Sequence, residues 1–143
     1  ELRDWIFEMN DWLLGVQELE FVYEDTEGRF YDASRPFGPP HASSTGVYLE
    51  GLIDAFALAR QTGDPERAER YRRSILLGIR SSMQLEFADA LDMFYVSKRD
   101  RIRGALRSRV YDNEVRVDNV QHTLMALQKI LRVFRDDDFE SRP

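Results

Sequence analysis

The feature that most constrains the fold is a helical segment that is apolar on nearly every side. Residues 47–59 contain only two charged side chains, Glu50 and Asp54. A helix without a broad polar face is normally buried between other elements. Residues 118–135 carry a similarly dense apolar set: Val120, Leu124, Ala126, Leu127, Ile130, Leu131 and Phe134. The sequence therefore predicts two buried helices, over residues 45–62 and 118–135.

Two amphipathic helices alternate with these apolar ones. Residues 2–19 are predicted to bury one stripe, which consists of Trp5, Ile6, Met9, Trp12, Leu13 and Val16. Residues 65–87 have a comparable stripe, which consists of Ala68, Tyr71, Ile75, Ile79 and Met83. The alternation predicts an all-α fold in two layers, with the second and fourth helices much more buried than the first and third.

The connections between the helices indicate that one helical hairpin is repeated. Gly63 suits the left-handed position after a helix, and Asp64-Pro65 suits the start of the next one. The first and third helices end in similar Gln- and Glu-containing segments, and each is followed by a short aromatic β-like piece, Phe30-Tyr31 or Phe94-Tyr95. We therefore predict a single domain over residues 1–143, with repeat units of about 1–64 and 65–143.

Composition limits the partners that the chain can have. Its 143 residues carry a formal net charge of −6, which disfavours a dedicated nucleic-acid binder. It has no cysteine, so thiolate zinc sites are excluded, and we predict neither a metal nor a cofactor. No apolar run approaches the roughly 18 residues that span a bilayer, so no membrane partner is expected. The sequence begins at Glu1 with no visible signal peptide, which favours a processed chain or a fragment, with cytoplasmic location weakly preferred.

Two segments resemble the α/α-toroid superfamily, especially its six-hairpin glycosidases and sugar epimerases. They are residues 41–64, HASSTGVYLEGLIDAFALARQTGD, and residues 112–122, DNEVRVDNVQH. Members of this group close a ring of such hairpins, whereas this chain has only two. Because two hairpins leave an apolar edge on each side, we expect further hairpins of a longer chain, or other copies in a homo-oligomer, to cover them.

The resemblance implies a sugar or uronate site near the starts of the two inner helices, at residues 37–48 and 107–122. Helix N-termini offer free N–H groups to such ligands. His41 and His122, one in each repeat, are candidate general acids or bases. The predicted catalytic residues are His41, Glu50, Asp118 and His122. The predicted substrate-binding residues are Tyr48, Tyr111, Arg116 and Asn119. The corresponding function is a carbohydrate-directed enzyme domain, either a hydrolase or epimerase-like.

Each of these residues also has a structural interpretation. Asp118, with Gln121, has the spacing of a helix cap. Glu50 and Asp54 lie four residues apart on one helix face and are predicted to pair with arginines of the third helix. The arginine-rich residues 98–109 form either a solvated loop or an anion site. The alternative function is therefore a non-catalytic helical module that binds partners or supports a neighbouring domain.

Overall fold

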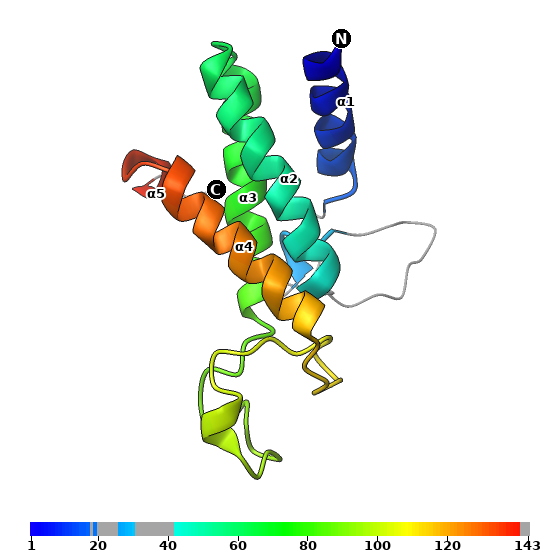
Figure 1. The fold of residues 1–143 in the computed structure, drawn as a ribbon, viewed down its shortest axis with the longest axis vertical. Coiled ribbons are helices and arrows are strands. Elements are labelled where there is room, and N and C mark those ends of the chain that lie inside the picture. Colours follow the sequence, from blue (N-terminus) through cyan, green and yellow to red (C-terminus); the bar gives the residue numbers. More distant parts are fainter. Residues whose placement is uncertain (18, 20–25, 31–41, 141–143) are drawn as a thin grey trace.

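The computed structural model describes residues 1–17, 19, 26–30 and 42–140, and it confirms the all-α class (Figure 1). Its helices are α1 (Leu2–Gly15), α2 (Ala42–Gln61), α3 (Pro65–Met83), α4 (Val117–Val133) and the short α5 (Asp137–Glu140), with a 3-10 turn, η2, at Arg99–Arg101. The described part of the chain contains isolated β-bridges but no strand. The four long helices lie where the sequence predicts them, whereas α5 is an addition.

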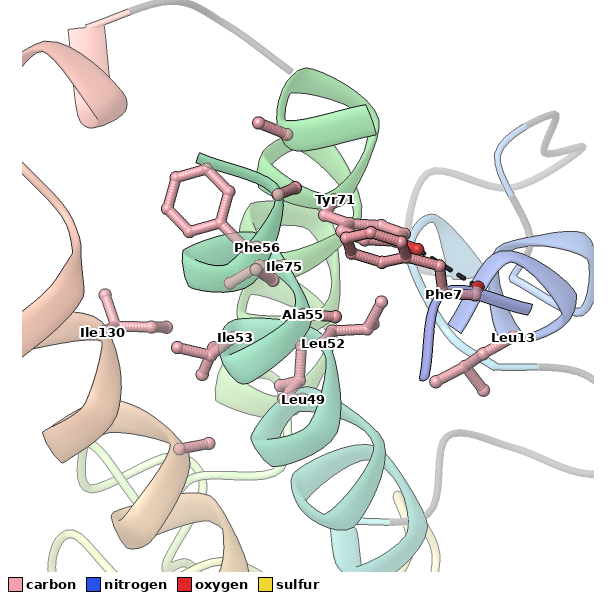
Figure 2. Packing of buried hydrophobic residues seen from close by; sticks show 13 residues of the cluster. Phe7, Leu13, Leu49, Leu52, Ile53, Ala55, Phe56, Tyr71, Ile75 and Ile130 are labelled. Carbon is pink, nitrogen blue, oxygen red and sulfur yellow. Dashed lines mark hydrogen bonds between the residues drawn. The ribbon is translucent and has the colours of Figure 1, made fainter. Parts of the chain in front are cut away.

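Helix α2 lies at the centre of the molecule, between α4 on one side and α1 on the other (Figures 1 and 2). Its apolar side chains point in several directions and are almost fully buried: Leu49, Leu52, Ile53, Ala55, Phe56 and Ala59. They join residues of α1, α3 and α4 in one continuous core. This burial is what an apolar helix requires, and it confirms α2 as an inner helix.

The second deeply buried helix is α3 and not α4, so this part of the predicted two-layer arrangement is wrong. Helix α3 buries even polar positions, because other parts of the chain cover them. Arg72 Nη1 donates to the carbonyl oxygen of Asp138, and the carbonyl oxygen of Ser74 accepts from Gln17 Nε2. Helix α4 buries one face alone, through Asn119, Thr123, Ala126 and Ile130. Helix α4 is therefore an edge helix, and several of its apolar side chains face solvent.

Helix α1 buries only part of the predicted stripe: Leu13 lies in the core, and partly buried Ile6 and Val16 pack against it. Phe7 and Leu13 enter the core (Figure 2). Three members of the predicted stripe are instead exposed, Trp5 by 59%, Met9 by 53% and Trp12 by 68%. Apolar residues occupy two arcs of this helix, and the described part of the chain covers only one of them.

Helix α1 is also anchored by polar contacts to α3. The Tyr71 hydroxyl donates to Asp11 Oδ1 at 2.9 Å and lies 3.3 Å from the carbonyl oxygen of Phe7 (Figure 2). Arg67 also donates to Asp11 Oδ2, at 3.3 Å. Burial raises the pKa of Tyr71, and the hydrogen bond to the Asp11 carboxylate raises it further. The neutral phenol is therefore the form that joins the two helices.

The turn between α2 and α3 has the predicted chemistry. Gly63 has a φ of +73°, which an L side chain rarely adopts. The Asp64 side chain accepts from the Arg67 backbone N–H at 3.0 Å and caps α3, and Pro65 is the first residue of that helix. This junction is confirmed.

The two predicted β-like pieces have different outcomes. Phe30 forms an isolated bridge with Gln17, while Tyr31 lies outside the described residues. Phe94 and Tyr95 lie in a turn, so the second piece is wrong. The bridge in that region joins Glu86 to Leu106 instead.

Candidate functional site

Two of the predicted catalytic residues form a hydrogen-bonded pair across the contact between α2 and α4. His122 Nδ1 lies 2.7 Å from Glu50 Oε1. The imidazole is 33% exposed and the carboxylate 17%. An ionised carboxylate only accepts hydrogen bonds, so Nδ1 is the donor when Glu50 is ionised, and Nε2 then has no hydrogen-bond partner among the described residues. The arrangement can hold an imidazole in one orientation while its other nitrogen meets a ligand.

The backbones of α2 and α4 approach closely, and this approach brings Glu50 and His122 together. A Cβ on Gly46 would lie 2.7 Å from the backbone nitrogen of Thr123 and 2.9 Å from the carbonyl carbon of His122. Gly46 therefore lets the start of α2 touch α4 beside the histidine. Glu50, one turn further along α2, then reaches the imidazole.

A second pair continues the same contact. Lys129 Nζ lies 2.5 Å from Asp54 Oδ2 and 3.2 Å from the Glu50 carbonyl oxygen. Glu50 and Asp54 thus both find their partners on α4, and the predicted pairing with arginines of the third helix is wrong. Those arginines interact with other acids: Arg67 with Asp11 and Asp64, Arg70 with Asp11, Arg72 with Glu69, and Arg80 with Glu27.

Asp118 does not cap α4, so that structural interpretation is also wrong. The N-cap position belongs to Arg116, and no side chain makes a cap hydrogen bond there. Asp118 accepts instead from the Arg116 guanidinium, at 3.0 and 2.9 Å. This hydrogen bond is the main reason that the pKa of Asp118 lies below its usual value. Both side chains are exposed, so the predicted catalytic Asp118 and substrate-binding Arg116 form a surface ion pair.

The remaining predicted site residues do not gather around Glu50 and His122. Asn119 is only 2% exposed; its Nδ2 donates to Ser108 Oγ at 2.9 Å, while its Oδ1 has no partner within the described chain. Tyr111 is exposed and its hydroxyl accepts from Arg109 at 3.2 Å. His41 lies outside the described residues.

Tyr48 belongs to a different surface, a groove between α1 and α2. This groove has a volume of about 490 Å³, and its lining is mainly apolar and aromatic: Trp5, Met9, Trp12, Leu13, Val47 and Tyr48. The Tyr48 ring also contacts Phe30 edge-on, with 5.1 Å between ring centres. The spacing of Trp5, Met9 and Trp12 is the sequence signal of this groove. The same spacing also predicts a buried stripe, so the groove is not predicted from the sequence alone.

The arginine-rich residues 98–109 are divided between contacts and solvent. Arg107 lies over the Phe87 ring and 3.5 Å from Asp92. Arg99, Arg101 and Arg103 are exposed. No group of three or more His, Asp or Glu residues within the described ranges is placed to hold a metal ion. Each helix in those same ranges is too short or too polar to cross a lipid bilayer.

Comparisons with known proteins add no assignment. No protein-family model, no curated protein and no solved structure matches this chain.

Proposed function

We propose that this chain is part of a carbohydrate-directed enzyme, and that Glu50 and His122 form its proton-transfer pair. The observation that supports this proposal is the 2.7 Å contact between Glu50 Oε1 and His122 Nδ1, in a pair that solvent still reaches. The sequence resemblance to the toroid glycosidases and epimerases suggests the ligand class. A sugar or uronate has the hydroxyl groups on which an imidazole can act.

In this proposal the two residues have separate roles. Neutral His122 accepts a proton at Nε2 from a sugar hydroxyl or from an attacking water. The Glu50 carboxylate holds the ring through Nδ1 and stabilises the imidazolium that forms. Of the other predicted residues, Arg116 is exposed and carries a charge that a uronate carboxylate could share with Asp118. Asn119 has no part in the proposal, since its side chain is buried.

A matched set of variants tests the pair. Titration calorimetry with glucuronate, galacturonate and glucose should detect binding to the wild type. We expect His122→Gln and Glu50→Gln to weaken that binding by about tenfold or more, equivalent to about 1.4 kcal/mol. Asp54→Asn is the control, because it changes a carboxylate on the same helix that pairs with Lys129 and not with His122. Absence of binding to the wild type, or equal binding by wild type and His122→Gln, contradicts the proposal.

The groove between α1 and α2 favours a second candidate function, that of a helical interaction module. Two tryptophans and a methionine point away from the core into a groove of about 490 Å³. Exposed apolar surfaces of this kind usually mark sites where another molecule binds. The two candidates use opposite sides of α2, so one chain can have both.

A further inference from the structure

On each of two opposite sides, the described residues leave an apolar surface without a covering element. On one side is the groove between α1 and α2. On the other side, across α2, lies α4 (Figures 1 and 2). On this helix Val117 is 82% exposed, Leu124 52% and Leu131 80%. Large apolar side chains that are this exposed at both edges leave the helical array open at both ends.

The two surfaces share one periodicity. On α1 the exposed residues Leu2, Trp5, Met9 and Trp12 follow a spacing of three, four and three. On α4 the three exposed residues lie seven apart, and half-buried Val120 and Leu127 fall between them. We name this set, Val117, Val120, Leu124, Leu127 and Leu131, the α4 seam. The spacing on both helices is that of two helices packed side by side at a shallow angle. The α1/α2 groove therefore has a form that can receive a helix, and the α4 seam is a helix face with the matching spacing.

The charges at the two surfaces favour contact between a groove and an α4 seam over contact between two identical surfaces. Glu8 lines the groove and has no ion-pair partner in the described part of the chain. Arg132 follows the last residue of the α4 seam, is exposed and is likewise without an ion pair among those residues. Contact between two grooves would bring two Glu8 carboxylates together. Contact between a groove and an α4 seam instead brings the opposite charges of Glu8 and Arg132 to the same interface.

We propose that the α1/α2 groove of one copy of this chain receives the α4 seam of a second copy. The contact is head-to-tail, so each copy keeps one free groove and one free seam. Repetition then gives a ring if the rotation closes and a filament if it does not. This inference is independent of the proton-transfer pair, which lies at the partly exposed contact between α2 and α4.

Single-edge variants test the head-to-tail contact. Wild-type protein should increase in mass with concentration in light scattering. Trp12→Ser removes one groove anchor and Leu131→Ser removes one seam anchor. We expect each variant alone to remain monomeric, with its apparent dissociation constant raised by about tenfold or more. An equimolar mixture should form a dimer and nothing larger, because the groove of Leu131→Ser and the seam of Trp12→Ser are intact.

Controls separate this contact from others. Leu91→Ser changes a leucine that is 81% exposed, close to the 80% of Leu131, in the loop after α3, and it should assemble as the wild type does. Circular dichroism checks that each variant is folded. A wild type that stays monomeric up to about millimolar concentration overturns the proposal. So does a mixture that forms no dimer, because a contact between like edges would then account for the assembly.

Discussion

The two sides of helix α2 are built from similar residues, but one side is closed by another helix and the other is partly exposed to solvent. The side toward α4 is closed: Gly46 meets the partner backbone, and Glu50 and Asp54 find His122 and Lys129. The side toward α1 is open, and Val47 is 45% exposed there. The difference shows that apolar character alone does not bury a helix face. Close approach and matched partners on the opposite helix are also required.

The largest expected effect concerns the closed side. Ile53→Ala removes a side chain with no exposed surface, so it should lower the free energy of unfolding by about 2–5 kcal/mol. Val47→Ala, on the open side, should change it by less than about 0.5 kcal/mol. Chemical denaturation of both variants measures the contrast. Equal losses would mean that the two sides do not differ as described.

Two glycines of α2 provide the next comparison. A Cβ on Gly46 meets backbone atoms of α4 at 2.7 and 2.9 Å, so Gly46→Ala should destabilise the protein by about 1–3 kcal/mol. A Cβ on Gly51 meets only Asn10 Oδ1, at an ordinary 3.6 Å. Gly51→Ala should therefore stabilise the fold by about 0.5–1 kcal/mol through helix propensity. The opposite signs should be visible in thermal melts, and destabilisation by Gly51→Ala would indicate that the open side is packed.

The positions of the helices could be predicted from the sequence because they depend on local patterns of residues. The apolar period located the four long helices, and Gly63, Asp64 and Pro65 marked one junction through their own backbone preferences. The central place of α2 was also readable, since residues 47–59 lack a polar face.

The sequence did not predict which side chains and helix faces contact one another. Both arcs of α1 are apolar, and periodicity does not show which arc the rest of the chain covers. Glu50 was predicted as catalytic and His122 likewise, yet their contact depends on the crossing of α2 and α4 at Gly46, which joins residues 72 positions apart. Asp118 has the residue type of a cap but lies two positions past the helix boundary at Arg116.

The anchoring of α1 gives a smaller, pH-dependent effect. Tyr71→Phe removes the hydroxyl that donates to Asp11, which should cost about 0.5–1.5 kcal/mol at neutral pH. The folded-state pKa of Tyr71 is raised above its ordinary value of 10.0, so its contribution is complete below pH 10 and is lost as the pH rises further. Denaturation between pH 8 and pH 11 should show a steeper loss for the wild type than for the variant. Parallel curves would argue against the neutral phenol as the link between α1 and α3.

The smallest effect tests whether charge or packing closes the α4 side. Asp54→Asn breaks the pair with Lys129, but the Asp54 side chain is 66% exposed. We expect a loss of about 0.2–1 kcal/mol, which added salt should reduce. A loss as large as that of Ile53→Ala would assign the closure to ion pairs instead of the buried core.

The central claim is that the α1 side of α2 is an open surface that a further helix covers. Trp5 and Trp12 are the only tryptophans in the chain, so tryptophan fluorescence reports on this surface alone. At low concentration the emission should be that of solvent-exposed indole and should be readily quenched by acrylamide. As the concentration rises, the wild-type emission should shift to shorter wavelength and resist quenching, while Leu131→Ser should keep the exposed spectrum. Buried-type emission from the dilute monomer, or exposed emission that persists in the assembled protein, would contradict the claim.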